Sequence, residues 1–402
     1  MNVITSRWLF KVKEIVGDNG EVTVKPKARL VARGFQQIEG VDFGETFAPV
    51  VKFTSIRILL ALVAYFNLEL HQMDVVTAFL QGDINEDVYM EVPEGVTGIN
   101  KRNNVCKLKK SLYGLKQSPR MWNKKMDEFL VDKLQFQAIS ADPCFYTRAR
   151  GNSTILISLY VDDLLIAASR IEDIAWIKGE LHKRFEVKDL GEARICLGLE
   201  IERDRKEGIL RLSQNRYILK ILDRFKMSDC KPEQTPMDEN KIPSKRLEMS
   251  VQAGMNTKYA YREAIGSLIY LMIGTRPDIA FAVGKLSQFC EEPTEEHWLA
   301  VKRVFRYIAG TKEHKIHYSS KDRLILRGYC DADWGGDVKT RKSTTGYLFK
   351  LAGGSISWCS RKQTCISLST CEAEYVALCT ACKELVWLRR FLTQLRILKD
   401  NE

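Results

Sequence analysis

ILISLYVDDLLIAA, residues 155–168, is the stretch that decides the fold: an apolar run of strand-forming residues is interrupted by two adjacent carboxylates, Asp162 and Asp163. Two short apolar runs that abut an acidic pair predict a β-hairpin whose tight turn presents both carboxylates at a sheet edge. Burying an ionised carboxylate without a partner is unfavourable, and two neighbouring carboxylates repel. A divalent metal ion is therefore the expected partner, and a solvated hairpin tip is the alternative.

The composition of the whole chain is that of a globular protein with a polyanionic partner. Its 402 residues are 45% hydrophobic, enough for a large core in two or three domains. The net charge of +11 favours nucleic acid as that partner. No run approaches 18 uncharged apolar residues, and the first residues turn charged too early for a secretory signal. The sequence thus predicts an intracellular protein without a membrane segment.

Hydrophobic spacing and turn residues predict a mixed α+β order along the chain. A basic hairpin is expected over residues 7–33, with its turn at 17–20, and a helix over 54–66 with Thr54 or Ser55 as its N-cap. The other strands are expected at 68–79, 194–201, 209–213, 323–331, 344–351 and 354–360. The other helices are expected at 120–136, 172–185, 214–225, 259–274, 278–290, 294–309 and 370–395. An exposed connection is expected at 227–257.

Asp74 supplies a third carboxylate within an apolar segment. Template-directed polymerisation uses two Mg²⁺ ions bridged by carboxylates from different strands, and Asp74, Asp162 and Asp163 would provide that set. Phe79 follows Asp74 by five residues. It would lie beneath an incoming sugar and exclude a 2′-hydroxyl, or else be an ordinary core residue.

Four segments in this order resemble the reverse transcriptase of Ty1/copia-type retrotransposons, and the resemblance covers essentially the whole chain. They are KARLVARGFQQIEGVDFGETFAPVVKFTSIR (27–57), QMDVVTAFLQGDINEDVYMEVPEG (72–95), SLYGLKQSPRMW (111–122) and LYVDDLLIA (159–167). The family fold is a right hand of fingers, palm and thumb. The resemblance implies fingers and palm at 1–226, and a linker with a helical thumb and connection at 227–320.

The resemblance also implies roles for individual residues. Asp74, Asp162 and Asp163 would form the catalytic metal site for two Mg²⁺ ions, with Mn²⁺ as a possible substitute. Phe79 would be the steric gate, and the turn from Tyr113 to Pro119 would contact template and nucleotide. The nucleotide-binding set is then Lys27, Arg29, Phe79, Tyr113, Gly114, Lys116 and Gln117. The residues implied for primer and template are Tyr160, Leu197 and Gly198.

Residues 321–402 resemble the RNase H domain that follows reverse transcriptase in these elements, through GYCDADWGGDVKTRKSTTGYLFKLAGGSISWCSRKQTCISLSTCEAEYVAL (328–378). Its first two metal-binding acids would be Asp331 and Glu374. Asp333 and Glu372 are neighbouring alternatives whose side chains point elsewhere by strand and helix geometry. The other two acids are expected further along than this chain reaches, so a partial RNase H-like domain without ribonuclease activity is expected.

The expected function is RNA-directed DNA polymerisation within a retrotransposon pathway that leads to DNA integration. Its partners would be an RNA template, a DNA primer, the RNA–DNA hybrid and deoxynucleoside triphosphates. The expected location is the cytoplasm, a virus-like particle or the nucleus, and the oligomeric state is left open. The alternative is an inactive retroelement remnant that binds nucleic acid without polymerising.

Overall fold

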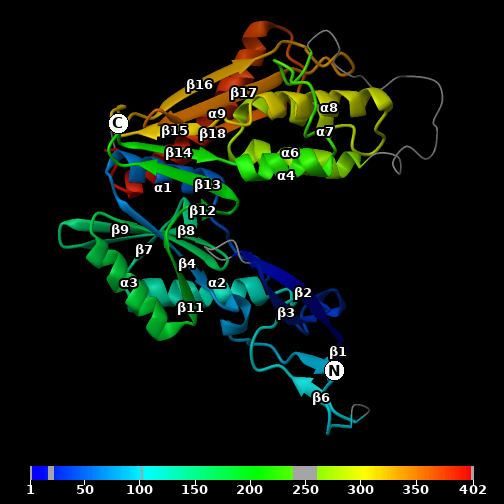
Figure 1. Cartoon of the computed structure of the whole chain (residues 1–402), viewed down its shortest axis with the longest axis vertical. Coiled ribbons are helices and arrows are strands. Elements are labelled where there is room, and N and C mark those ends of the chain that lie inside the picture. Colours follow the sequence, from blue (N-terminus) through cyan, green and yellow to red (C-terminus); the bar gives the residue numbers. More distant parts are fainter. Residues whose placement is uncertain (1, 17–21, 101–102, 239–259, 400–402) are drawn as a thin grey trace. The chain divides into compact units, whose positions relative to one another are not determined.

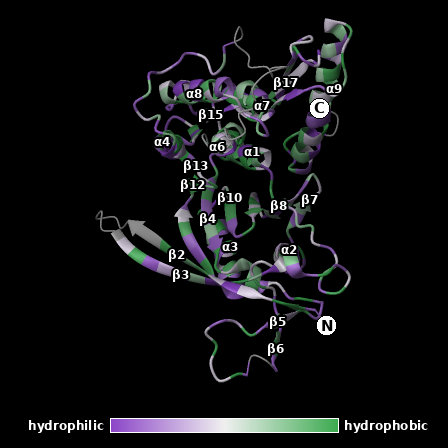
Figure 2. Ribbon diagram, turned by 90° about the vertical axis from the view of Figure 1, so that its right-hand side faces the viewer, coloured by the Kyte–Doolittle hydropathy of each residue, from purple (hydrophilic) through white to green (hydrophobic). Residues whose placement is uncertain are grey.

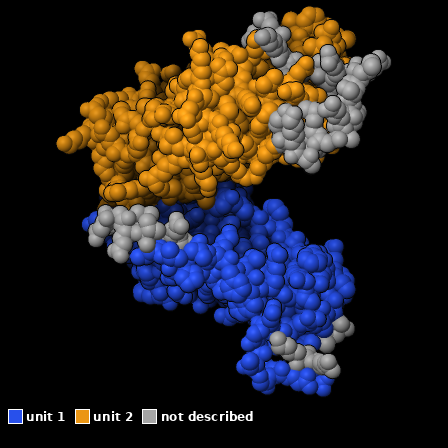
Figure 3. Space-filling model, turned by 45° about the vertical axis from the view of Figure 1, so that its right-hand side comes forward, with its two compact units in different colours: residues 1–51, 72–166, 171–191 blue, residues 52–71, 167–170, 192–402 orange. Residues whose placement is uncertain are grey.

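The computed structural model describes the chain except for residues 1, 17–21, 101–102, 239–259 and 400–402. The chain divides into two compact units, coloured separately in Figure 3. Unit 1 holds residues 1–51, 72–166 and 171–191, and unit 2 holds residues 52–71, 167–170 and 192–402. The sequence-based domains at 1–226, 227–320 and 321–402 stay a prediction.

The largest sheet of the described residues has six strands in the order β11-β4-β10-β9-β8-β7 (Figure 1). One half of the sheet holds β9 (Ser153–Tyr160), β8 (Asp142–Arg150) and the edge strand β7 (Gln137–Ile139), and the other half holds β10 (Asp163–Ala168), β4 (Glu69–Val75) and the edge strand β11 (Val187–Glu192). The predicted hairpin is therefore confirmed as β9 and β10. These are inner strands, so the prediction that the carboxylates lie at a sheet edge is wrong.

Helices α2 (Ser118–Glu128) and α3 (Ile171–Arg184) accompany this sheet, and a π-helical turn over Phe129–Lys133 extends α2. The side chain of Trp122 is 1% exposed and meets Phe185 edge-on, with ring centroids 5.4 Å apart. Apolar residues spaced three and four apart place Ile174, Ile177 and Leu181 on the buried face of α3.

A two-stranded ribbon, β2 (Ser6–Val16) with β3 (Val22–Ala32), forms the predicted basic hairpin. Hydrophilic and hydrophobic residues alternate along it (Figure 2). Lys11 pairs with Lys27 in the antiparallel register, so like charges face each other across the strands. The predicted turn at 17–20 lies outside the described residues. A small sheet of β1 (Val3–Ile4), β5 (Tyr89–Glu91) and β6 (Val105–Lys107) completes the strands of unit 1.

In unit 2, helix α1 (Phe53–Tyr65) accompanies the sheet β12-β13-β14-β15. The N-cap of α1 is Lys52, so the prediction of Thr54 or Ser55 is wrong. The strand predicted at 194–201 is also corrected, because it is two antiparallel strands joined by a tight turn. The bounds of the sheet are β12 (Ile195–Cys196), β13 (Leu199–Asp204), β14 (Ile209–Ser213) and β15 (Ile316–Ser319).

The helical part of unit 2 has its own hydrophobic core, in which Leu268, Val283 and Phe305 are fully buried. Its helices are α4 (Asn215–Arg224), α6 (Tyr261–Gly274), α7 (Ala280–Ser287) and α8 (Glu295–Gly310). The predicted helices at 214–225, 259–274, 278–290 and 294–309 are thus confirmed to within a few residues. No described helix is long and apolar enough to cross a membrane.

The last predicted strands and helix are also confirmed. They form the antiparallel sheet β16-β17-β18, with α9 (Thr370–Gln394) packed on β16 and β17. The buried residues of α9 lie on one face at helical spacing: Ala373, Ala377, Ala381, Leu388, Phe391 and Leu392. The strands are β16 (Arg327–Ala332), β17 (Thr344–Leu351) and β18 (Gly354–Lys362).

A buried arginine ties three elements of unit 2 together. Arg57 of α1 is 4% exposed and donates to the backbone oxygen of Ile356 in β18 at 2.7 Å. That bond comes from Nε, and Nη1 donates to the backbone oxygens of Ile273 and Gly274, at the end of α6, at 2.6 and 3.0 Å. The guanidinium also lies 4.0 Å from the ring centre of Trp358. Burial lowers the pKa of Arg57 to about 10.

Candidate active site

The hairpin between β9 and β10 holds its acidic tip in a strained conformation. Val161 has a φ of 57°, which is unfavourable for a β-branched residue. The indole nitrogen of Trp122 donates to the backbone oxygen of Val161 at 2.6 Å, and the amide of Val75 donates to that of Asp162 at 2.9 Å. Sequence reasoning missed this use of Trp122, because nothing local links it to a turn 39 residues away.

The three predicted carboxylates act on one another. Asp74 lies on β4, the strand beside β10, and Asp163 begins β10. Partial burial raises the pKa of Asp162 above its ordinary value, and the charge of Asp74 raises it further. Burial likewise raises the pKa of Asp163, to which Asp162 and Asp74 both add. The site therefore stores like-charge repulsion that a cation would relieve.

The side chains of this cluster do not converge on one point. Among the described residues, no group of three or more His, Cys, Asp or Glu side chains is arranged to hold a metal ion. The amide of Gln72 donates to Oδ1 of Asp163 at 3.3 Å and lowers the pKa of that carboxyl. Sequence reasoning missed Gln72, although its position two residues before Asp74 places both on one face of β4.

Two cations of the ribbon act on the tip. Lys27 and Arg29 are two residues apart and therefore lie on the same face of β3. The positive charge of each lowers the pKa of Asp162, against the rise that burial causes. The guanidinium of Arg29 also lies 5.5 Å from the ring centre of Tyr113. The structure thus brings the predicted triphosphate-binding residues to the carboxylates.

Phe79 is half-buried and lies outside the described core. It sits in the 3-10 turn Ala78–Gln81, which follows Thr77 in a left-handed conformation. Its ring meets that of Tyr113 edge-on at a centroid distance of 5.2 Å. Because the side chain is only partly buried, the steric gate and the alternative of an ordinary core residue both stay predictions.

The turn over Tyr113 and Gly114 is fixed against the ribbon. The amide of Ala32 donates to the backbone oxygen of Tyr113 at 2.7 Å. Gly114 has a φ of +93°, and a Cβ there would stand 2.1 Å from the backbone oxygen of Ala32. Only glycine fits this approach.

We expect Gly114→Ala to destabilise unit 1 by on the order of 2–4 kcal/mol, because a side chain adds strain at positive φ and a backbone clash. Gly44→Ala, in the same unit, is the matched control, since a Cβ at Gly44 meets nothing within 4 Å. Thermal melting of the two variants checks the expectation. Equal melting temperatures would contradict the close approach.

Lys116 and Gln117 are engaged with the protein itself. The side chain of Gln117 is fully buried; its amide donates to the backbone oxygen of Asp42 at 2.8 Å and accepts from Gln37 at 3.0 Å. The ammonium of Lys116 lies 4.3 Å from the ring centre of Phe43. In this arrangement both residues hold the segment 37–43, and their direct contact with a nucleotide stays a prediction.

The residues predicted for primer and template fall in both units. Tyr160 ends β9 next to the acidic tip. Leu197 and Gly198 both have positive φ, at 49° and 74°, and form the two-residue turn between β12 and β13. The hydroxyl of Tyr270 donates to the backbone oxygen of Leu197 at 2.5 Å. Because Leu197 and Gly198 belong to unit 2, their part in this site stays a prediction.

The second acidic pair lies in unit 2. Asp331 on β16 and Glu374 on α9 are exposed, and both charges raise the pKa of Cys330, which burial raises first. The carboxylates of the two alternative acids already accept hydrogen bonds from backbone amides. Asp333 accepts from the amide of Thr344, and Glu372 accepts from that of Leu368 at 2.6 Å.

Comparison with known proteins shows the family to which the chain belongs. Residues 1–239 match the family described as reverse transcriptase (RNA-dependent DNA polymerase). The chain belongs to this family. More particularly, several of the curated relatives it matches over most of its length are Pol polyproteins of Ty1/copia-type transposons, which confirms the resemblance read from the four motifs.

Two of these relatives come from plants. The chain is 48% identical over 392 residues to the retrovirus-related Pol polyprotein from transposon TNT 1-94 of Nicotiana tabacum, covering 97% of this chain and 29% of the relative. It is 41% identical over 397 residues to that from transposon RE1 of Arabidopsis thaliana, covering 99% and 26%. The chain thus spans less than a third of either polyprotein.

A third relative has a length closer to that of this chain. The putative transposon Ty5-1 protein of Saccharomyces cerevisiae is 34% identical over 305 residues, which cover 76% of this chain and 97% of that protein.

Proposed function

We propose that the chain extends a DNA primer on an RNA template, with residues 1–226 as fingers and palm and 227–320 as linker, thumb and connection. The observation that carries the proposal is that three carboxylates and two ribbon cations of unit 1 lie near enough to influence one another's charge, beside the Phe79–Tyr113 ring pair. Incoming nucleotides would be deoxynucleoside triphosphates, and the product an RNA–DNA hybrid. Positive charge and aromatic surface beside acidic groups suit this chemistry.

The donor set fits magnesium. Asp74, Asp162 and Asp163 offer only carboxylate oxygens, which Mg²⁺ prefers, and their mutual repulsion calls for a cation. Two bound Mg²⁺ ions, or Mn²⁺ in their place, would activate the primer hydroxyl and neutralise charge on the triphosphate. Asp163 would have to leave Gln72 for its carboxylate to join such a set.

The remaining residues would bind and orient the nucleotide. Lys27 and Arg29 would neutralise the triphosphate. Arg29 and Phe79 both contact Tyr113, so the ring of Tyr113 links the triphosphate side to the sugar side. Binding energy from these contacts would position the reacting atoms.

A primer-extension assay on poly(rA)/oligo(dT) with Mg²⁺ tests the proposal. Incorporation by the wild type that disappears in the variant carrying both Asp162→Asn and Asp163→Asn is the expected result. Incorporation that survives this double variant would refute the metal assignment. The inactive-remnant alternative predicts template binding that weakens steeply with salt, without extension by the wild type.

Phe79→Ala should admit ribonucleotides, because the side chain that would collide with a 2′-hydroxyl is removed. The preference for deoxynucleotides should fall by about 10–200-fold, the usual effect of one shape contact on selectivity. Phe47→Ala is the control, since Phe47 is 75% exposed in the same unit. Ratios of kcat/KM for dTTP and rUTP check this. An unchanged ratio would return Phe79 to a structural role.

Ribonuclease activity is left out of the proposal. Asp331 and Glu374 act together on Cys330, but the described residues bring no third acid to them. We expect no acid-soluble label from the RNA strand of a hybrid. Its release would show that the pair suffices.

A further inference from the structure

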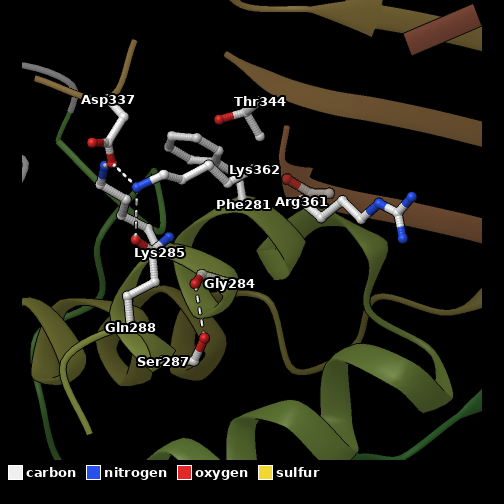
Figure 4. A pocket seen from close by; sticks show the side chains of 10 residues that line it. Phe281, Gly284, Lys285, Ser287, Gln288, Asp337, Thr344, Arg361 and Lys362 are labelled. Atoms are coloured by element: carbon white, nitrogen blue, oxygen red, sulfur yellow. Dashed lines mark hydrogen bonds and ion pairs between the residues drawn. The ribbon is translucent and has the colours of Figure 1, made fainter. Parts of the chain in front are cut away.

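A second cluster of opposite charges lies in unit 2, in a recess of about 220 Å³ between α7, β17, β18 and the loop after β16 (Figure 4). The proposed polymerase site does not use it. Its lining includes the ammonium groups of Lys285 and Lys362, the carboxylate of Asp337 and the hydroxyl residues Ser287, Thr344 and Ser360.

Two lysines share one carboxylate oxygen in this recess. The ammonium groups of Lys285 and Lys362 donate to Oδ2 of Asp337 at 2.9 and 2.8 Å. Oδ1 of Asp337 accepts from the amide and the hydroxyl of Thr340, both at 2.8 Å. Every carboxylate oxygen is thus engaged, and Asp337 is only 8% exposed.

The charges do not balance. One carboxylate neutralises one ammonium, whereas Lys285 and Lys362 are 13% and 27% exposed and lose much of their hydration. A clamp for the loop would need one lysine, because a second uncompensated cation in a recess costs free energy. Each ammonium has three N–H donors: Lys285 uses one on Asp337, and Lys362 uses one on Asp337 and one on Oε1 of Gln288 at 3.5 Å. A second anion would accept the remaining donors and restore neutrality.

The other lining groups agree with an anion of several oxygens. Thr344 and Ser360 contribute hydroxyl groups. The hydroxyl of Ser287 already donates to Gly284. The guanidinium of Arg361 points away from Asp337 in Figure 4, so it does not add to the pair of lysines. At about 30 Å³ per water, the recess has room for a tetrahedral oxyanion with some of its hydration.

We propose that this recess binds one phosphate group between Lys285 of α7 and Lys362 of β18. The phosphate belongs either to a nucleic-acid backbone or to free inorganic phosphate. Both sources present negatively charged, non-bridging phosphate oxygens that can accept from the two ammonium groups. The site is independent of the polymerase reaction, so its test needs no catalysis.

The test titrates the full chain with inorganic phosphate by calorimetry, against chloride at matched ionic strength. Lys285→Met and Lys362→Met should each weaken phosphate binding by about tenfold. Arg361→Met is the matched control: it removes one cation from the residue beside Lys362 and should leave the affinity unchanged.

Asp337→Asn distinguishes a binding site from a structural clamp. The amide oxygen still accepts from Thr340, while the competing negative charge is gone, so phosphate should bind about tenfold tighter. A clamp without a ligand predicts a lower melting temperature for this variant and no phosphate binding in any variant. That outcome, or equal affinity in all variants, would overturn the proposal.

A second arm identifies the source. The slope of log affinity against log salt is measured for an RNA–DNA hybrid. If the phosphate comes from the backbone, Lys362→Met should reduce the slope by about one unit relative to Arg361→Met. Equal slopes, together with phosphate binding that needs Lys362, would assign the site to free phosphate.

Discussion

Asp162→Asn should lower primer extension by about a thousandfold while leaving the fold at least as stable as the wild type. The loss in rate follows because a charged oxygen ligand at the hairpin tip is replaced by a neutral amide, which would cost several kcal/mol of transition-state stabilisation. The gain in stability follows because the substitution removes one of the repelling carboxylates. Single-turnover extension and thermal melting measure the two effects.

The stability part of this prediction has a defined pH dependence. The pKa of Asp162 is raised in the folded state, so the folded protein binds more protons than the unfolded chain just above the ordinary carboxyl pKa. The contribution of Asp162 to the free energy of unfolding is fully present below that ordinary pKa and is lost as the pH rises through the raised pKa. The melting temperature of Asp162→Asn should therefore exceed that of the wild type at pH 7, and the difference should vanish near pH 3.

Asp132→Asn serves as the control, since it makes the same chemical change at an exposed residue of unit 1. It should change neither rate nor melting. A variant at Asp162 that melts well below the wild type would mean that the carboxylate stabilises the turn, against the repulsion inferred here. Retained extension would remove Asp162 from the catalytic set.

Arg57→Met should destabilise unit 2 by about 3–5 kcal/mol. The substitution keeps much of the volume but leaves the backbone oxygens of Ile356, Ile273 and Gly274 without their donor in a buried place. Urea unfolding followed by tryptophan fluorescence measures the loss, because Trp358 touches the guanidinium.

Arg216→Met, on a side chain that is 77% exposed, is the control and should stay within about 0.5 kcal/mol of the wild type. Arg57→Lys keeps the charge with a single donor group and should fall between wild type and Arg57→Met, which keeps the test informative if the latter does not fold. A change below 0.5 kcal/mol in Arg57→Met would show that the three carbonyl groups find other partners.

Most of the helices and strands could be predicted from local sequence patterns. The hairpin around Asp162, the basic ribbon and the helices were predictable because each shows its periodicity or turn residues within a short window. Strand β15 (Ile316–Ser319) was not, because four residues carry little periodicity and its partner β14 lies about a hundred residues earlier. The turn at Leu197 and Gly198 had a local signal in its glycine, which the surrounding apolar run obscured.

The acidic residues of the site could be predicted from the sequence, but the residues that hydrogen-bond to them could not. The acids can be recognised because they are charged residues within apolar runs, whereas Trp122 and Gln72 look like ordinary residues of a helix and a strand. Gln117 shows the converse, since a polar residue in a motif turned out to be fully buried and bound to its own protein. Such roles depend on contacts between distant segments, which spacing does not reveal.

The hydrogen bonds of Arg57 also determine when helix α1 can reach its final packing during translation. Its partner Ile356 lies 299 positions further along the chain. At about 5–20 residues per second, helix α1 would wait roughly 15–60 seconds on the ribosome before that carbonyl group emerges. Until Ile273 and Gly274 are made, 216 and 217 positions after Arg57, the charged guanidinium of this mostly apolar helix has none of its final acceptors, and it lacks Ile356 until the C-terminal sheet is made. The nascent chain would therefore need hydration or a chaperone to cover α1.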